Sequence, residues 1–303
     1  MTHVPTQRAA DTPVLRINHV KKVYGRGEGA VEAIRDLDFC VQGGQMVCLV
    51  GPSGAGKSTL LRCIAGLLTP TDGHVLLKGQ NVTGPPPGMA VVFQEYARSL
   101  FPWLTVTANV ELPLKEKRLP KAERRRLVSE ALKAVGLADV PASYPWQLSG
   151  GMQQRVAIAR AVAFEPDVLL MDEPFAAVDA QTRAELEDLV RDLWHRLGIT
   201  LLFVTHDIDE AIYLGQRVLV LSGRPTVVLE DVAVKLPDDR NQVDTRNDPE
   251  FARLRAHIYY LVQKARWGYR PTCSPEPGQT LPSSPHDPLP DASRRKDTPW
   301  SQL

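Results

Sequence analysis

Five short runs of apolar residues recur along the chain, and each has the length of a strand. Each run is flanked by polar residues, glycine or proline, and none of them alternates between apolar and polar positions. Continuous apolar runs of this kind are typical of parallel strands that are buried on both faces. We therefore expect five buried strands, at residues 46–50, 89–93, 168–171, 201–204 and 218–221.

Segments with helical spacing separate these runs. One helix is predicted from an apolar stripe that consists of Leu186, Leu189, Leu193 and Leu197, and Gly198 is placed to end that helix. From about residue 95 to about residue 163 the strand-like runs disappear and helical spacing takes over, as at Leu127, Ala131, Leu132 and Val135. Strands that alternate with helices predict an α/β fold with a parallel sheet covered on both faces. Residues 95–163 predict an α-helical subdomain inserted into that fold.

A β-rich layer is predicted before the first buried strand. Residues 14–23 carry spaced apolar positions typical of an edge strand, residues 25–29 form a glycine-rich turn, and residues 31–41 form a second strand. Tyr24 lies between the first strand and the turn. It is either an aromatic platform for a nucleobase or a half-buried strand tyrosine, and the pattern alone favours the strand.

The two ends of the chain differ in composition from its middle. Residues 1–12 are polar and predicted to be flexible, and residues 268–303 are rich in proline and serine and predicted to be disordered. Between them we expect a main domain at 13–240 and a helical extension at 241–267. Its helix begins near Asp248, a cap residue that precedes a proline, and its apolar stripe is Phe251, Leu254, Ile258 and Leu261.

The overall composition is that of an ordinary globular protein. The chain has 303 residues, 43% hydrophobic residues and a net charge of +1, and near-neutral charge argues against a dedicated nucleic-acid binder. No apolar run approaches the roughly 18 residues that span a bilayer, and the N-terminus has no apolar signal segment. Any work at a membrane would therefore need another chain to span it. A reducing compartment is expected because no Cys-x-x-Cys or zinc spacing joins Cys40, Cys48, Cys63 and Cys273.

A glycine-rich loop follows the run at 46–50. It contains a glycine, four further residues and then Gly-Lys-Ser, the pattern of the phosphate-binding loop of a nucleoside triphosphatase. Glycine lets successive N–H groups turn toward phosphate oxygens, Lys57 supplies a mobile positive charge, and Ser58 supplies a hydroxyl group for Mg²⁺. The candidate phosphate-binding residues are Gly51, Pro52, Ser53, Gly54, Ala55, Gly56, Lys57, Ser58 and Thr59.

The context of this loop agrees with the pattern. A helix that begins near Ser58 would add free N–H groups and a positive partial charge, and both favour an anion. The alternative is a glycine-rich turn that matches by chance. The buried strand before the loop and the helix after it argue against that alternative.

Polar residues stand at or just beyond the carboxyl ends of three predicted strands. They are Gln94, the pair Asp172-Glu173, and His206. In open parallel sheets, ligand-facing polar residues lie at that end of the strands. The alternative for the acidic pair is a solvated turn, and the alternative for the histidine is a satisfied surface residue.

The sequence Leu-Ser-Gly-Gly-Met-Gln-Gln-Arg at 148–155 resembles the signature of the ATP-binding cassette (ABC) ATPases. It stands between the phosphate loop and Asp172-Glu173, as that family requires. The resemblance covers roughly residues 14–236 and implies a P-loop NTPase (RecA-like) core with an antiparallel β layer and an inserted α-helical subdomain. Other features match in order, namely Tyr24 as the adenine-stacking aromatic, Gln94 as the strand-end glutamine, Asp172-Glu173 as the Walker B pair, Ala177-Val178-Asp179 as the dimer-contacting loop and His206 as the switch histidine.

The resemblance implies ATP and Mg²⁺ as cofactors and a role for each residue. Asp172 would hold Mg²⁺ through its water shell, together with Ser58 and Gln94. Glu173 would be the general base that polarises the attacking water. His206 would contact the γ-phosphate, and Gln94 would also relay the state of the site to a membrane partner.

The signature implies a second copy of the cassette. Ser149, Gly150 and Gly151 are predicted to open a helix whose N-terminus binds an anion, and the resemblance makes that anion the γ-phosphate of ATP held by another cassette. The chain has one phosphate loop and one signature, so two copies, or one copy and a homologous cassette, would meet head to tail around two ATP molecules.

The segment after Gln94 indicates what the ATPase drives. Leu-Phe-Pro-Trp at 100–103 resembles the ATPases of nitrate, sulfonate and taurine importers, as does the helix near residue 250. Phe101, Pro102 and Trp103 would then lie where transmembrane permease subunits dock, although Trp103 could instead pack inside the helical subdomain. This implies a peripheral protein on the cytoplasmic face of the cell membrane, working with a separate solute-binding protein.

Other readings remain beside the importer. An exporter or a lipid-extraction ATPase would share every catalytic residue, and a soluble ABC ATPase acting on DNA or ribosomes belongs to another class. The basic run at 121–126 is a solvated helix face or a phospholipid or nucleic-acid patch, and the first is favoured. Two departures are small: Val178 replaces the usual leucine, and the turn at 25–29 is longer than usual.

Overall fold

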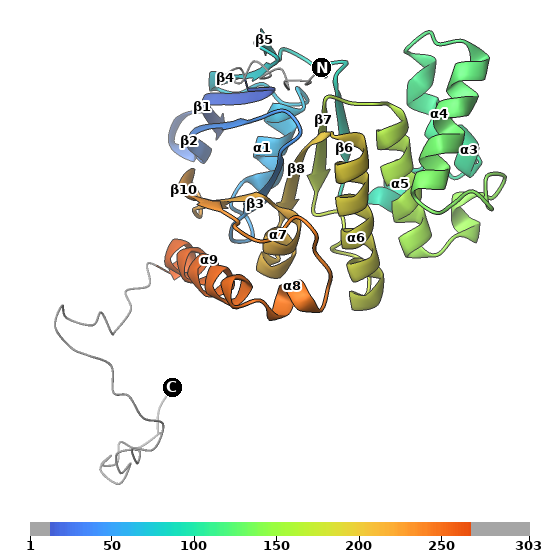
Figure 1. The fold of residues 1–303 in the computed structure, drawn as a ribbon. Helices are drawn as coiled ribbons and strands as arrows, with labels where there is room; N and C mark the ends of the chain where they lie inside the picture. Colours follow the sequence, from blue (N-terminus) through green and yellow to red (C-terminus); the bar gives the residue numbers. More distant parts are fainter. Residues whose placement is uncertain (1–12, 268–303) are drawn as a thin grey trace, which may run out of the picture. The chain divides into compact units, whose positions relative to one another are not determined.

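One ten-stranded sheet organises the described part of the protein. The computed structural model describes residues 13–267, so the predicted flexible segment 1–12 and disordered segment 268–303 lie outside the described residues. Figure 1 shows the sheet with helices on its faces. From one edge to the other the strands are β5 (Gln80–Asn81), β4 (Asp72–Leu77), β1 (Leu15–Tyr24), β2 (Val31–Val41), β10 (Thr226–Ala233), β9 (Arg217–Leu221), β3 (Met46–Val50), β8 (Thr200–Thr205), β7 (Val168–Asp172) and β6 (Met89–Val92).

The five apolar runs form the parallel half of this sheet, from β9 to β6, as predicted. Alternate residues of β3 enter two different apolar clusters. Met46, Cys48 and Val50 belong to one cluster, and Val47 and Leu49 belong to the other. Because side chains alternate across a strand, both faces of the sheet are covered, which explains why the runs lack alternation. The predicted α/β class is confirmed.

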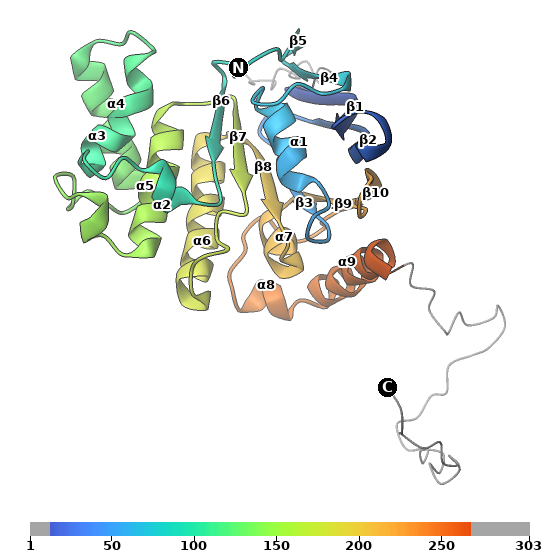
Figure 2. The same ribbon diagram turned by 180° about the vertical axis from the view of Figure 1, so that it is seen from behind.

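Helices cover the two faces of the parallel half. α1 (Lys57–Ile64) packs with Val47 and Leu49 on one face, whereas α6 (Ala180–Leu197) and α7 (Ile208–Leu214) pack on the other. Figures 1 and 2 show α1 and α6 on opposite sides of the strands. The prediction that Gly198 ends α6 is confirmed, since its φ is +62° and its N–H donates to the carbonyl of Trp194 at 2.9 Å.

The prediction that residues 14–23 form an edge strand is wrong in one respect. β1 lies inside the antiparallel half, paired with β2 on one side and β4 on the other, and the two-residue β5 occupies the edge. The mixed pattern has another cause. The register of β1 shifts between Ile17 and Val20 and again near Lys22, so its inward-facing residues do not keep a strict two-residue period.

β10 was not expected from the sequence. It pairs antiparallel with β9 and parallel with β2, and it thereby joins the two halves of the sheet. Its sequence Thr-Val-Val-Leu-Glu-Asp-Val-Ala includes charged and half-exposed positions, so it does not resemble the other buried runs.

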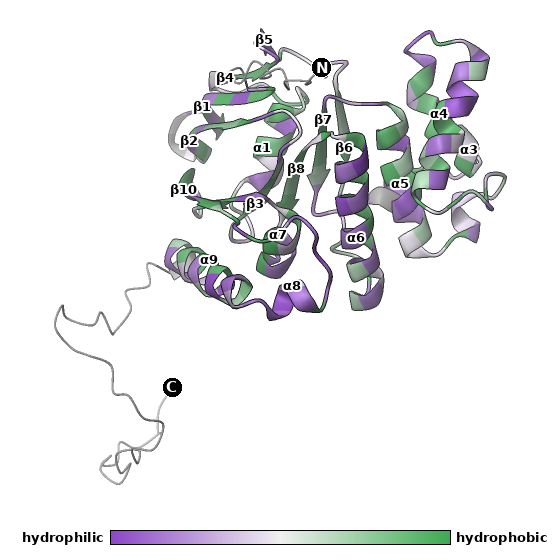
Figure 3. Cartoon of the chain, viewed as in Figure 1, coloured by the Kyte–Doolittle hydropathy of each residue, from purple (hydrophilic) through white to green (hydrophobic). Residues whose placement is uncertain are grey.

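The stretch at 95–163 contains only helices. Leu127, Val128, Ala131 and Leu132 face the core on α4, and Figure 3 shows this alternation of apolar and polar faces. The basic run at the start of α4 is partly paired, because Arg126 contacts Glu123 and Glu130 on an exposed face. The elements are α2 (Tyr96–Ser99), α3 (Val106–Glu111), the 3₁₀ turn η2 (Leu112–Lys115), α4 (Lys121–Ala134), the 3₁₀ turn η3 (Pro145–Gln147) and α5 (Gly150–Ala163).

Two helices follow the sheet, α8 (Asp244–Asn247) and α9 (Pro249–Trp267). The carboxylate of Asp248 accepts the N–H of Glu250 at 2.7 Å, which agrees with the predicted helix start. Of the predicted stripe, Phe251, Leu254 and Ile258 are fully buried. Within residues 13–267, none of the helices combines the length and the apolar character that crossing a bilayer requires.

We expect Gly198→Ala to lower the free energy of unfolding by about 1 kcal/mol. A Cβ atom at this position would meet no atom within 4 Å, so the cost comes from the left-handed backbone alone. Gly84→Ala is the matched control because that site is equally open and lacks the positive φ. Urea denaturation of both variants measures the difference, and equal stabilities would contradict the backbone explanation.

Candidate functional site

The phosphate loop connects β3 to α1 and closes on itself. Gly56 has a φ of +79°, and a Cβ atom there would lie 3.1 Å from the hydroxyl oxygen of Thr226 and 3.2 Å from the carbonyl of Ala33. Both the conformation and the space therefore require glycine. The helix begins directly afterwards at Lys57, so its first N–H groups lie beside the loop.

Lys57 lies inside this loop with only 5% of its surface exposed. Its ammonium group donates to the carbonyl of Gly51 at 2.9 Å and to that of Pro52 at 3.2 Å, and it lies 3.6 Å from the carboxylate of Glu173. Burial lowers the pKa of the Lys57 ammonium group, while the nearby carboxylate opposes this change. The loop thus presents a desolvated positive charge, which attracts an anion more strongly than an exposed lysine does.

Ser58 and Asp172 meet across the gap between α1 and β7. The hydroxyl of Ser58 donates to the carboxylate of Asp172 at 3.3 Å. Asp172 is nearly buried, and this burial raises the pKa of its carboxyl group. One hydroxyl and one carboxylate suit Mg²⁺, which keeps several waters and is completed by substrate phosphates. No group of three or more acidic, histidine or cysteine side chains forms a metal cage within residues 13–267.

Glu173 and His206 form a hydrogen-bonded pair beside Lys57. A nitrogen of the His206 ring lies 3.0 Å from the Glu173 carboxylate. Glu173 has a φ of +43°, which a non-glycine residue rarely adopts, while its N–H donates to the carbonyl of Val204 at 2.8 Å. A positive φ at a non-glycine residue costs roughly 1–3 kcal/mol, and such strained residues cluster at functional sites. It turns the carboxylate from the end of β7 toward Lys57 and His206.

Gln94 lies beyond the end of β6 and is exposed. Within the described residues, no hydrogen bond or ion pair joins its side chain to Lys57 or Asp172. Tyr24 is closer to the loop: its hydroxyl lies 3.3 Å from that of Thr59, and 41% of its surface is exposed. The ammonium group of Lys22 lies over the Tyr24 ring, 5.5 Å from its centre.

The signature residues lie on a separate surface. Ser149 caps α5 by accepting the N–H of Met152 at 3.3 Å, and Ser149 and Gly150 are exposed. A Cβ atom on Gly151 would lie 2.6 Å from a methyl carbon of Thr182 at the start of α6. Thr182 also bonds to Asp179, so the signature adjoins the predicted dimer-contacting loop. Within one chain it does not contact the phosphate loop.

Comparisons with known proteins agree with this geometry. The family model described as ABC transporter matches residues 34–176. A nitrate import ATP-binding protein, NrtD of Synechocystis sp., is 44% identical over 254 residues, which cover 82% of this chain and 95% of NrtD. This chain belongs to the ABC transporter family.

Two further proteins are similar to this cassette, one over a smaller share of its own length than NrtD and one at lower identity than NrtD. A bicarbonate transport ATP-binding protein, CmpC of Synechococcus elongatus, is 44% identical over 77% of this chain and 35% of CmpC. A dimeric post-hydrolysis structure of the ATP-binding cassette MJ0796 bound to ADP and Pi has a TM-score of 0.65 and 34% identity, and it covers 74% of this chain and all of that one. The cassette is therefore an ATP-binding ATPase of the ABC fold.

The cassette structure adds residues that the sequence did not indicate. Arg224 donates to the carbonyl of Gly54 at 2.8 Å, and the hydroxyl of Thr226 bonds to the carbonyl of Ala55. Arg183 lies 3.5 Å from both the carbonyl of Val178 and the carboxylate of Asp207, so it connects two loops that flank the site. None of these residues belongs to a short motif, because they come from segments that are distant from the loops they contact.

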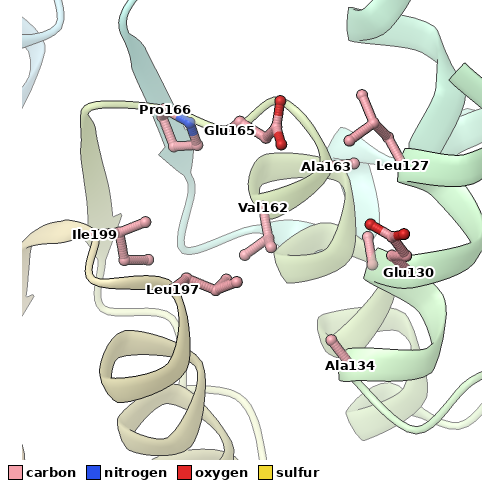
Figure 4. A pocket seen from close by; sticks show the side chains of 10 residues that line it. Leu127, Glu130, Ala134, Val162, Ala163, Glu165, Pro166, Leu197 and Ile199 are labelled. Atoms are coloured by element: carbon pink, nitrogen blue, oxygen red, sulfur yellow. The ribbon is translucent and has the colours of Figure 1, made fainter. Parts of the chain in front are cut away.

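A pocket of about 270 Å³ lies away from this site (Figure 4). Pro166 and Ile199 in its lining precede β7 and β8, so the pocket lies at the amino ends of strands whose carboxyl ends carry the site. Glu130 and Glu165 are its acidic residues, and most of the rest of its lining is apolar. It has no residue in common with the nucleotide site.

Glu210 on α7 gives the cassette a pH-dependent stability. Burial raises the pKa of its carboxyl group from the ordinary 4.5 to about 8. The negative charges of Glu187 and Asp207 also raise this pKa, and the positive charge of Arg183 lowers it. Between these two pH values the folded state holds a proton that the unfolded chain releases. The free energy of unfolding therefore falls as pH rises through this window.

We expect Glu210→Gln to remove this slope, because the amide stays neutral. Relative to the unchanged protein, the variant should gain a few kcal/mol between about pH 5 and about pH 8. Urea denaturation at several pH values measures the difference in free energy of unfolding between the two proteins. The contributions of all other titrating groups cancel in this difference. The exposed Glu116→Gln serves as control, and a pH-independent difference for Glu210→Gln would contradict the assignment.

Proposed function

We propose that this cassette is the ATP-hydrolysing subunit of an importer for small solutes of the nitrate, sulfonate or taurine kind. The observation that carries the enzymatic part is the convergence of Lys57, Ser58, Asp172, Glu173 and His206 on the phosphate loop. The similarity to a nitrate import ATP-binding protein over nearly its whole length supports the importer part. The choice of solute belongs to other chains of such a system.

The chain's own residues suit hydrolysis by water. Lys57 and the N–H groups of residue 51 and residues 53–59 hold the phosphates of ATP, with Tyr24 against the adenine. Ser58, Asp172 and Gln94 would hold Mg²⁺, which would neutralise charge on the phosphate oxygens when bound. Glu173 takes a proton from the attacking water as general base, and His206, which contacts Glu173, reaches the γ-phosphate from the other side.

Two copies complete the site. Ser149 and Gly150 are exposed at the start of a 14-residue helix, Gly151 is partly buried beside them, and none of the three contacts its own phosphate loop. The start of this helix is therefore available to the γ-phosphate of a partner copy. A head-to-tail pair makes two equal composite sites. ATP then closes the dimer, and hydrolysis releases it because the shared contact to the γ-phosphate is lost.

A cluster of exposed aromatic rings supports docking to transmembrane permease subunits. Trp103 is 70% exposed and stacks edge-on with Phe101, and Trp146 is 71% exposed and stacks on Tyr144. The two segments adjoin, since the N–H of Val106 donates to the carbonyl of Ser143 at 2.8 Å. Exposed aromatic residues are typical of protein interfaces. The subunit would sit on the cytoplasmic face of the membrane and serve a solute-binding protein through the permease.

We expect Glu173→Gln to bind ATP and to lower kcat by about 100-fold or more, because it loses the proton acceptor and keeps the binding contacts. Size-exclusion chromatography with saturating ATP and Mg²⁺ should show a stable dimer. Glu116→Gln, an exposed change, should hydrolyse ATP at the ordinary rate. A monomeric Glu173→Gln protein in saturating ATP would contradict the composite site.

We expect Trp103→Ala to reduce permease-stimulated ATPase and transport at least about tenfold, since aromatic anchors dominate interface energy. ATP binding by the isolated subunit should not change. Tyr259→Ala is the matched control, because Tyr259 is an exposed aromatic residue on α9. Loss of ATP binding in isolated Trp103→Ala would indicate a packing role instead, and intact transport would contradict the proposed docking surface.

A further inference from the structure

The position of His206 depends on the helix that follows it. β8 ends at Thr205, and Asp207 already caps α7 by accepting the N–H groups of Asp209 at 2.9 Å and Glu210 at 3.2 Å. His206 is thus the single residue between the end of the strand and the helix cap. A shift of α7 therefore moves the His206 ring relative to Glu173.

The start of α7 is attached to the C-terminal helices by ion pairs. Arg255 on α9 donates two hydrogen bonds to the two carboxylate oxygens of Asp209, at 2.5 and 2.7 Å. Arg246 on α8 lies 3.8 Å from the same carboxylate and 2.7 Å from that of Glu187 on α6. Asp209 is thus the acidic residue through which both C-terminal helices contact the first turn of α7.

The end of α7 is held by the segment that leads into these helices. Arg240 donates to the carbonyls of Ile212 at 3.0 Å, Tyr213 at 2.8 Å and Gly215 at 3.0 Å. α9 also packs against α7, and Phe251 and Leu254 are buried there in the shared apolar cluster. The apolar contacts fix the distance between the helices, and the two-oxygen contact to Asp209 fixes their orientation.

Another ion pair on α9 has no such link. Arg253 contacts Glu250 one turn away on the same helix, and it reaches no part of α7. The Asp209–Arg255 pair is also partly exposed, and such pairs have little effect on stability, but it differs from Arg253–Glu250 because it joins two helices.

We propose that Asp209 is a positioning residue for ATP hydrolysis, through which Arg255 and Arg246 of the 241–267 extension hold His206 in place. This inference rests on the proposed role of His206. The positions of α8 and α9 then determine how well His206 contacts the γ-phosphate. A movement of α9 therefore changes the rate of hydrolysis more than it changes the affinity for ATP.

The test is steady-state ATPase kinetics of the full chain carrying Asp209→Asn, Arg255→Gln or both. We expect kcat to fall about fivefold or more while KM for ATP stays within about twofold, since small misplacements of a catalytic group reduce rate more than binding. The double variant should be no slower than the slower single variant, because Arg255→Gln removes a contact that Asp209→Asn already removes. Asp209→Glu, which keeps the ion pair, should restore most of the rate.

Two further variants and a melting curve separate the explanations. Arg253→Gln should match the unchanged protein. His206→Ala should lose most of its activity, and if it did not, the proposed role of His206 would fail. If His206→Ala were inactive while Asp209→Asn and Arg255→Gln kept the ordinary kcat, the positioning role would be wrong.

Thermal melting should show nearly unchanged midpoints for these variants. Arg255→Gln, on the protein surface, keeps the test valid if Asp209→Asn folds poorly. A fall in kcat that followed the fall in melting midpoint, with no recovery in Asp209→Glu, would indicate a merely structural role.

Discussion

The buried ammonium group of Lys57 is the constraint on which the rest of this cassette depends. A desolvated positive charge is costly unless oxygen atoms surround it. The carbonyls of Gly51 and Pro52 and the carboxylate of Glu173 supply those atoms. They can do so only because the loop doubles back on itself and because Glu173 adopts an unusual backbone conformation.

The parallel sheet explains why these groups meet. β3, β7 and β8 are adjacent and run in the same direction, so their carboxyl ends bring together the phosphate loop, the Asp172-Glu173 pair and His206. Residues more than a hundred positions apart in the chain thereby contact one another without any long loop. The signature lies away from this edge because it begins a helix in the inserted segment, which is why the proposed site needs a second copy to complete it.

Much of this arrangement could be predicted from the sequence for a physical reason. A strand buried on both faces must be continuously apolar, so the five core strands were evident, and polar residues at their ends were the natural site candidates. β1 was misplaced because register shifts near Val20 blur its pattern. β10 was missed because it is only partly buried, and with it Thr226 and its contact to the phosphate loop.

Other features of the site depend on contacts that no local pattern records. Glu173 combines a positive φ with a bond from its N–H to Val204 on the neighbouring strand. Arg183 and Arg224 reach their partners through tertiary packing alone. Such residues have no spacing or composition that separates them from ordinary surface arginines, so only the folded chain reveals them.

The late position of β10 has a consequence for biosynthesis. This strand lies between β2 and β9 and contacts the phosphate loop through Thr226, yet it is made after every other strand of the sheet. While the ribosome is still translating the preceding residues, the antiparallel layer and the parallel core have no strand between them. Folding of a nascent chain proceeds from its N-terminus. A growing polypeptide therefore carries every nucleotide motif up to His206 before the strand that bonds to Ala55 of its phosphate loop has been made.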